Sequence, residues 1–166
     1  MAILYKHEWY EKLQEQDRLL VFDAFEQEDA LQIGLSAVEL AKRYGNPASV
    51  RVVFDDLVVF SYFMPGTSLG NVWWMDKKIR VAKRTGVSSL LSHAQLLEGD
   101  KAPEPWNDDE ENYALHGGCV TIKNRDGAVV GYVVTSGLQH YEDHQLGVDT
   151  VAKRLGIEVP VIGAQG

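Results

Sequence analysis

The chain lacks the features that would take it out of the ordinary globular class. Its 166 residues include a single cysteine, Cys119, so no disulfide can form within one chain and a reducing cytoplasm is the favoured compartment. The longest apolar runs, such as Leu57 to Phe60, fall far short of the roughly 20 residues that span a bilayer. The first residues carry neither a basic start nor a cleavage site. Neither a membrane anchor nor a secretory signal is therefore expected.

Positive charge is also scarce. The chain has 16 Lys and Arg against 24 Asp and Glu, a net charge of −8 with histidine neutral. This balance disfavours nucleic acid as a partner, because phosphate binding needs a basic surface. Neither an internal repeat nor a Gly/Ser linker divides the sequence, and its length is enough for one core. We therefore expect a single domain over residues 1–166.

The spacing of apolar residues predicts an alternation of helices and hairpins. The expected elements are, in order, a helix over about 6–16, a strand over 19–22, a helix over 27–44, a hairpin over 50–64, helices over 71–84 and 89–97, a hairpin over 118–135, and a helix from 136 to 155. In the helix over 27–44 the polar stripe is so narrow that its second side is expected to face another element or a second subunit.

The close strand pairs are all hairpins, so we expect a mainly antiparallel sheet in an α+β fold. The strand over 57–64 is apolar at nearly every position, which predicts that it is buried. Asp126-Gly127 is a strong turn signal for the second hairpin. Ser136 and Gln139 form a capping-box pattern, and Asn71 is expected to cap the helix that it opens.

Four short segments contain residue types that bind ligands or exchange protons. They are N-V-W-W-M-D-K-K-I-R at 71–80, H-G-G-C at 116–119, T-S-G-L at 135–138 and E-D-H at 142–144.

With these segments the chain resembles the GlcG/HbpS-like family, also called the haem-degrading-domain family, and in particular its uncharacterised-protein-family branch from bacteria and fungi. The resemblance extends over about 28–156. It implies a profilin-like three-layer sandwich, a five-stranded sheet with helices on both faces, and a homo-oligomer that is a dimer or larger. Some relatives bind haem or cobalamin-related ligands, but the family implies no settled reaction for this branch. Four residues match family positions: Asn71, Trp74, Lys77 and Arg80.

The candidate site is a pocket where the 116–119 loop meets the start of the last helix. Free N–H groups near Ser136 and Gly137 and the helix dipole favour a carboxylate or phosphate there. Capping of the helix by Ser136 is the structural alternative. The ligand-binding residues that we predict are His116, Gly117, Gly118, Ser136, Gly137, Glu142, Asp143, His144, Asn71, Trp74, Lys77 and Arg80.

Several of these residues also have a purely structural explanation. Lys77 and Arg80 fit a solvated basic helix face, and Trp74 fits a core or interface anchor. Gly117 and Gly118 would admit a ligand closely, or would only allow a tight turn into a crowded strand.

Acid/base chemistry is the main catalytic hypothesis. His144 and Glu142 are its candidates, with His116 as their partner across the pocket. The alternative is that the acids stabilise the helix N-terminus while His144 packs beside them. Cys119 could act as a nucleophile, but a lone cysteine between Gly and Val is typical of a small core residue.

His140 and His144 are four residues apart, a spacing that can chelate a metal. The run H-Y-E-D-H lacks the H-E-x-x-H pattern, however, and no third ligand is fixed, so we expect no metal.

Together these features favour a cytoplasmic, homo-oligomeric protein that binds a small anionic ligand, without nucleic acid or membrane as partner. Haem or another carboxylate-bearing ligand is the leading candidate, and any haem would be bound noncovalently because the sequence has no C-x-x-C-H motif. One alternative is an enzyme that does acid/base or oxidative chemistry on a small anionic substrate. The other is a structural protein whose motifs hold an oligomer without a ligand.

Overall fold

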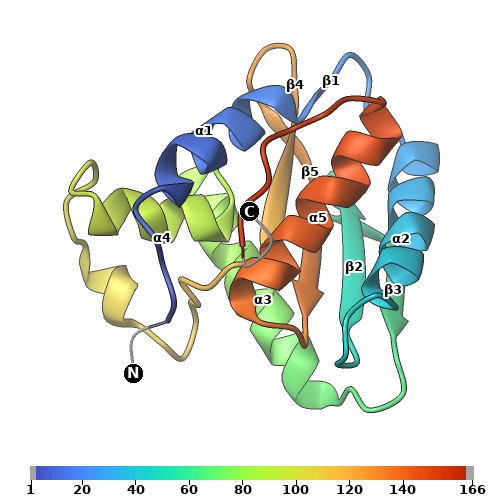
Figure 1. Cartoon of the computed structure of the whole chain (residues 1–166), viewed down its shortest axis with the longest axis horizontal. Helices are drawn as coiled ribbons and strands as arrows, with labels where there is room; N and C mark the ends of the chain where they lie inside the picture. Colours follow the sequence, from blue (N-terminus) through green and yellow to red (C-terminus); the bar gives the residue numbers. More distant parts are fainter. Residues whose placement is uncertain (1–2, 164–166) are drawn as a thin grey trace.

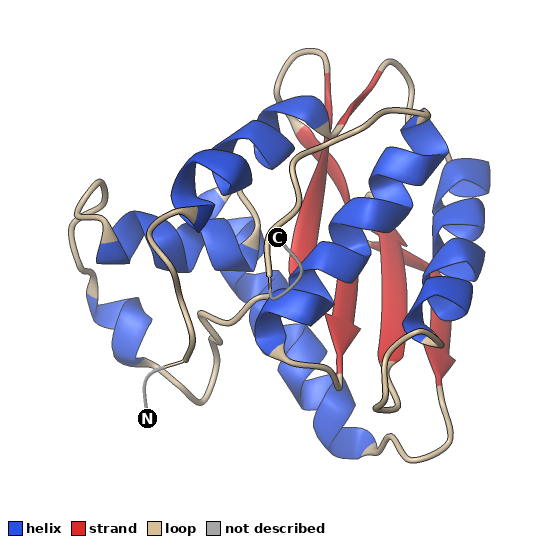
Figure 2. Cartoon of the chain, in the orientation of Figure 1, coloured by secondary structure: helices blue, strands red, loops and turns tan. Residues whose placement is uncertain are grey.

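Five strands form one sheet with helices on both of its faces in the computed structural model, which describes residues 3–163 (Figure 1 and Figure 2). The elements are α1 (Trp9–Leu19), β1 (Val21–Phe22), α2 (Gln27–Ala41), β2 (Ser49–Phe54), β3 (Leu57–Phe63), α3 (Leu69–Thr85), α4 (Ser89–Leu97), a 3-10 turn η1 (Pro105–Asp108), β4 (Cys119–Asn124), β5 (Val129–Ser136) and α5 (His140–Leu155). The strand order is β1-β4-β5-β2-β3, with β1 parallel to β4 and every other pair antiparallel. This confirms the expected three-layer sandwich and its mainly antiparallel sheet.

Alternate residues of the strands face two separate cores. Val133 packs into the cluster under α2 and α5, whereas its neighbour Val134 packs with Met75 and Ile79 of α3 on the other side. Figure 1 shows α2 and α5 lying across one face and α3 behind the sheet. Because successive side chains of a strand point to opposite faces, β5 must be apolar on both.

α1 and α4 form a smaller layer beside β4. Trp9 and Leu13 of α1 pack against Leu90 and Leu91 of α4, and Ile162 from the segment after α5 joins the same cluster. Segments from both ends of the chain thereby cover the start of α5, where Trp9 contacts Tyr141 at 5.5 Å between ring centroids.

Two of the predicted helix starts are wrong. Ser136 remains in the β-ladder opposite Ser49, so the capping residue of α5 is Gln139, which pairs reciprocally with Glu142. Ser68 caps α3, and Asn71 lies inside the first turn, where its side chain accepts a hydrogen bond from the Ser68 N–H. In both cases the capping box begins three residues away from the predicted cap, because residues of the same type recur within one turn.

The prediction that 57–64 is a buried strand is also wrong. β3 lies at the edge of the sheet, where Leu57 is 60% exposed and Val58 is 56% exposed. Val59 and Phe60 are the partly buried residues of this strand, and the Phe60 ring lies so close to α2 that a Cβ at Gly34 would come within 2.2 Å of it. An unbroken apolar run has the same appearance in a central strand and in an edge strand that carries an interface.

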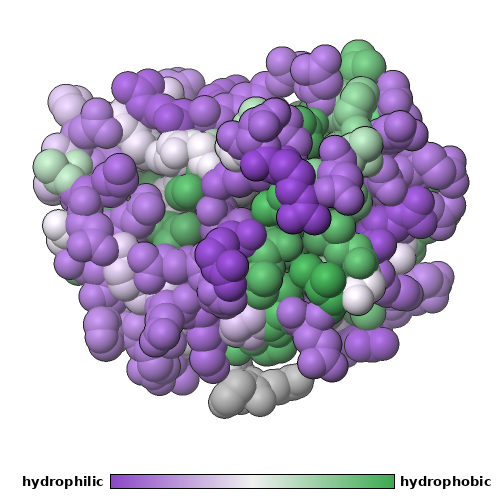
Figure 3. Space-filling model, turned by 90° about the horizontal axis from the view of Figure 1, so that it is seen from above, coloured by the Kyte–Doolittle hydropathy of each residue, from purple (hydrophilic) through white to green (hydrophobic). Residues whose placement is uncertain are grey.

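The surface seen from above is mainly hydrophilic, with one apolar area near the middle of this view (Figure 3). Within residues 3–163 no helix combines the length and the apolar character needed to cross a membrane.

Candidate functional site

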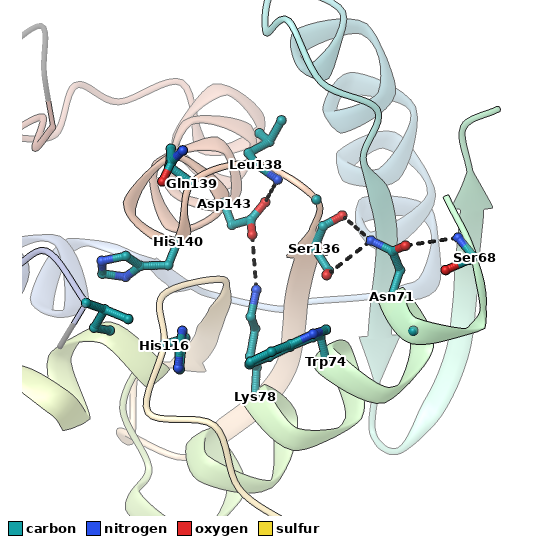
Figure 4. Close-up of a pocket in the computed structure, with 13 residues that line it drawn as sticks. Ser68, Asn71, Trp74, Lys78, His116, Ser136, Leu138, Gln139, His140 and Asp143 are labelled. Carbon is teal, nitrogen blue, oxygen red and sulfur yellow. Dashed lines mark hydrogen bonds and ion pairs between the residues drawn. The ribbon is translucent and has the colours of Figure 1, made fainter. Parts of the chain in front are cut away.

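A pocket of about 500 Å³ opens where α3 and α5 both begin (Figure 4). We call it the α3–α5 pocket; its lining residues are Ile3, Ser68, Gly70, Asn71, Trp74, Lys78, His116, Ser136, Gly137, Leu138, Gln139, His140 and Asp143. Each helix N-terminus carries a partial positive charge from its aligned peptide dipoles, so both helices favour negative charge in this space.

A buried ion pair lies between the two helices in this pocket. Lys78 is 3% exposed and Asp143 is 2% exposed, and the Lys78 ammonium lies 3.1 Å from the Asp143 carboxylate. The ammonium also donates to the Thr135 carbonyl at 2.9 Å. Burial raises the pKa of the Asp143 carboxyl, while Lys78 and backbone N–H groups oppose that rise. An ammonium has three donors, and in the described part of the chain only two of them have acceptors, so one is left for a ligand.

The two glycines of the H-G-G-C segment make room for this arrangement. Gly118 has φ +143°, and a Cβ there would come within 2.6 Å of the Lys78 ammonium. A Cβ at Gly117 would come within 2.3 Å of the His140 carbonyl oxygen. The glycines therefore let Lys78 and α5 approach the strand closely, and neither of them lines the pocket itself.

The backbone donors just before α5 are already in use. Asp143 accepts the Leu138 N–H at 3.1 Å, and Glu142 accepts the Gln139 N–H at 3.1 Å. The N–H groups that were expected to be free near Gly137 thus bind the helix's own carboxylates. In α3 the Gly70 N–H donates to no group among residues 3–163, so this helix offers a free backbone donor at the pocket.

His116 is the pocket histidine whose ring remains open. Its ring packs against Trp74 with 5.0 Å between centroids, and neither ring nitrogen makes a hydrogen bond within the described residues. Burial, helped by the Lys78 charge, lowers the pKa of His116, which keeps the imidazole neutral at pH 7. A neutral imidazole with a free nitrogen can coordinate a metal or accept a proton.

His140 is held from both sides. Its Nδ1 accepts the Gly117 N–H at 3.1 Å, and its Nε2 lies 2.6 Å from the Leu4 carbonyl, to which it donates. Burial lowers the pKa of His140 to about 4, so this neutral tautomer persists at pH 7. The hydrogen bond to Gly117 also brings the diglycine segment to the start of α5, as the sequence predicted.

His144 lies under α1 and outside the lining of the α3–α5 pocket. It is 2% exposed, and its Nε2 donates to the Gln16 side-chain oxygen at 2.8 Å. Burial lowers its pKa to about 3. Glu142 lines a different surface pocket, beside Asp149. The two acid/base candidates are therefore not brought to the α3–α5 pocket.

The spacing of His140 and His144 does not produce a metal site. Both nitrogens of His140 are engaged, and among residues 3–163 no group of three or more His, Cys, Asp or Glu side chains could hold a metal ion. Cys119 is fully buried, and burial raises the pKa of its thiol, which disfavours the nucleophilic thiolate.

The pocket brings together about half of the predicted ligand-binding residues. Those that line it are His116, Ser136, Gly137, Asp143, Asn71 and Trp74. Those that lie outside its lining are Gly117, Gly118, Glu142, His144, Lys77 and Arg80.

Lys78 is the residue that the sequence interpretation missed. Asn71, Trp74 and Lys78 follow the spacing i, i+3, i+7 and therefore share one helix face, which was a signal present in the sequence. Lys77 lies 100° from Lys78 about the axis of α3, and its ammonium lies over the Trp74 ring, 5.7 Å from the ring centroid. Arg80 is exposed and donates to the Asn112 carbonyl.

Comparison with known proteins gives a family match over most of the chain. The family model described as haem degrading protein HbpS-like matches residues 25–152. A UPF0303 protein of Streptomyces coelicolor is 34% identical over 146 residues, covering 87% of this chain and 92% of that protein. A UPF0303 protein of Rhizobium johnstonii is 31% identical over 151 residues, covering 91% and 93%.

Solved structures share the fold. The Ybr137w protein superposes with a TM-score of 0.76 and 27% identity, covering 87% of this chain and 86% of that one. The PduOC:Heme complex superposes with a TM-score of 0.65 and 20% identity, covering 82% and 98%. An HbpS double mutant from Streptomyces reticuli superposes with a TM-score of 0.63 and 20% identity, covering 82% of this chain and 90% of that one.

Proposed function

The chain belongs to the HbpS-like family, and on that premise we propose that its α3–α5 pocket binds a small carboxylate-bearing ligand. The observation that carries the proposal is the unused N–H of a buried ammonium, Lys78, lying between two helix N-termini in a pocket of about 500 Å³. A pocket of this volume lies within the usual range for small-molecule sites.

Negative charge is the best complement to these groups. Lys78 balances Asp143, so the pocket contains no net side-chain charge from this pair, and the two helix dipoles tip the balance toward anions. The Gly70 N–H and the remaining Lys78 N–H are both donors, and a carboxylate accepts from both. Trp74 and His116 supply a wall against which an apolar ligand body would pack.

A direct test uses hexanoate as the probe. In ¹H–¹⁵N spectra we expect a saturable shift of the Gly70 amide in the wild-type protein. The same titration of Gly70 in a Lys83→Gln variant serves as a charge-matched control, because Lys83 pairs with Asp56 away from the pocket. If the Gly70 amide does not move in either protein, the proposed function is wrong.

Haem is the first larger ligand to test, because the PduOC:Heme complex shares this fold. The residues fit it: His116 is neutral with free ring nitrogens and would coordinate the iron, and Lys78 would face a carboxylate of the porphyrin. Bound haem would supply redox or oxygen chemistry at that iron.

We expect haem titration to give a saturable Soret shift in the wild-type protein and a changed or lost shift in His116→Ala. His7→Ala is the control, because His7 is exposed and pairs with Glu98. Equal spectra for His116→Ala and His7→Ala would rule out His116 as the ligand to iron.

We also propose that the protein is a homo-oligomer in which the β3 edges of two copies pair. Four apolar side chains on this seven-residue edge strand are exposed: Leu57, Val58, Tyr62 and Phe63. The strand carries no charged residue, so two copies can lie antiparallel about a two-fold axis without repulsion.

Light scattering after size-exclusion chromatography tests this proposal. We expect a dimer or larger species for the wild type and a smaller species for Val58→Lys. Leu97→Lys is the matched control, since Leu97 is 55% exposed but lies at the end of α4. A monomeric wild type would refute the proposal.

The single cysteine, buried in the core, suits a reducing compartment, and we propose that the protein is located in the cytoplasm.

A further inference from the structure

We propose that the α3–α5 pocket is one end of a longer groove, and that its ligand is an elongated dianion with a carboxylate at each end. This inference rests on the proposed function and specifies its ligand. Beyond Trp74 and His116 a second chamber adjoins this pocket. We call it the Lys77 chamber; its lining residues are Ile3, Trp74, Lys77, His93, Asn107, Glu110, Tyr113, Ala114, Leu115 and His116.

The two spaces adjoin. Ile3, Trp74 and His116 line both of them, and the Lys77 chamber adds about 460 Å³ to the 500 Å³ of the α3–α5 pocket. Trp74 is 44% exposed, so its ring presents a free surface at the junction, and His116 packs against it. The two packed rings thus form a surface shared by both chambers, across which a slender apolar ligand body would lie.

A cation lies on each side of this shared surface. Lys77 and Lys78 are neighbours on α3, so their side chains leave the helix 100° apart, one into each chamber. Trp74 precedes them by three and four residues and therefore lies on the same side of the helix, at the junction. Lys77 is half-buried, and it forms no ion pair within residues 3–163. Its ammonium lies over the Trp74 ring and is free to pair with a ligand anion.

Two buried polar atoms in the Lys77 chamber also lack partners. Among residues 3–163, neither the His93 Nδ1 nor the Asn107 side-chain nitrogen has a hydrogen bond, although both atoms are buried. Such atoms are rare in folded proteins, because an unpaired buried polar group costs about 1–3 kcal/mol. Lys77 would donate to the second carboxylate of a ligand, and Asn107 lies beside it in the chamber lining. Glu110 is the carboxylate of this chamber, and solvent screens it because it is exposed.

The test compares adipate with hexanoate, two acids of equal chain length that differ in the second carboxylate. We expect adipate to bind the wild-type protein about tenfold more tightly in calorimetry. In ¹H–¹⁵N spectra adipate is expected to shift both the Gly70 amide and the Asn107 side-chain amide, whereas hexanoate shifts Gly70 alone.

Lys77→Gln is expected to abolish the adipate advantage while leaving hexanoate binding unchanged. Lys83→Gln, the charge-matched control on the same helix, is expected to keep the advantage. Equal affinities of the two acids for the wild type, or equal behaviour of the two variants, would overturn the inference and leave the proposed function standing. If neither acid moves the Gly70 amide, the proposed function fails and the inference fails with it.

Discussion

We expect acidification from pH 7 to pH 5 to lower the free energy of unfolding by about 2 kcal/mol through His144 alone. The ring is 2% exposed, its Nε2 donates to Gln16, and its Nδ1 has no partner within the described residues. Burial lowers the pKa of His144 from 6.5 to about 3 in the folded protein. The unfolded state therefore binds this proton first as the pH falls.

Stability falls with falling pH because the pKa of His144 is lower in the folded state than in the unfolded state. The stabilisation from a neutral His144 is complete above pH 6.5 and is lost progressively as the pH falls toward 3. Between pH 7 and pH 5 the unfolded histidine binds on average about 0.7 proton more than the folded one, and over two pH units at 1.36 kcal/mol per unit this difference gives about 2 kcal/mol. His140, with a pKa of about 4, adds to the loss in the same direction.

Urea unfolding at pH 7, 6 and 5 measures this effect in the wild type and in His144→Gln. The glutamine does not titrate and retains an amide donor for Gln16, so the variant is expected to lose about 2 kcal/mol less over this range. His7→Gln is the control: His7 is exposed and the Glu98 carboxylate raises its pKa, so removing it is not expected to lessen the acid-side loss. If His144→Gln loses stability as steeply as the wild type, the assignment of a buried neutral His144 is wrong.

Three further outcomes follow from the pocket and the core. Lys78→Met is expected to destabilise the protein by about 3–5 kcal/mol in urea unfolding, because Asp143 is left buried without its partner, and Lys78→Met combined with Asp143→Asn is expected to recover most of that loss. Gly118→Ala is expected to lower the free energy of unfolding by about 3 kcal/mol, because the new methyl group clashes with Lys78 and the backbone φ is unfavourable for alanine. Gly127→Ala also has an unfavourable positive φ but open space around it, and it is expected to lower the free energy of unfolding by about 1 kcal/mol. Cys119 is expected to resist thiol reagents in the native protein and to react on unfolding; rapid native modification would contradict its burial.

Much of the fold was predictable because local patterns carry it. The Asp126-Gly127 turn joins β4 to β5 as expected, with Gly127 at φ +83°. The apolar faces of α2 and α5 and the glycine that ends α5 were also read correctly, with boundaries that shift by a few residues. A shift of this size is ordinary, because several residues of one type can serve as the cap.

The candidate site was only partly predictable. The meeting of the diglycine segment with the start of α5 was expected, and the hydrogen bond between Gly117 and His140 bears it out. The choice of Lys77 over Lys78 was wrong for the α3–α5 pocket, because helix periodicity separates faces but does not tell which face looks inward when both carry lysine.

By itself the sequence determined the elements, the mainly antiparallel sheet and the family, since periodicity and short motifs act over a few residues. Only the tertiary structure decided that β3 is an exposed edge, that His144 is buried under α1, and that Lys78 is paired with Asp143. Each of these depends on contacts between segments far apart in the chain: Gln16 meets His144 across 128 positions, and Lys78 meets Asp143 across 65. Burial and charge pairing are properties of such contacts, so no local pattern could reveal them.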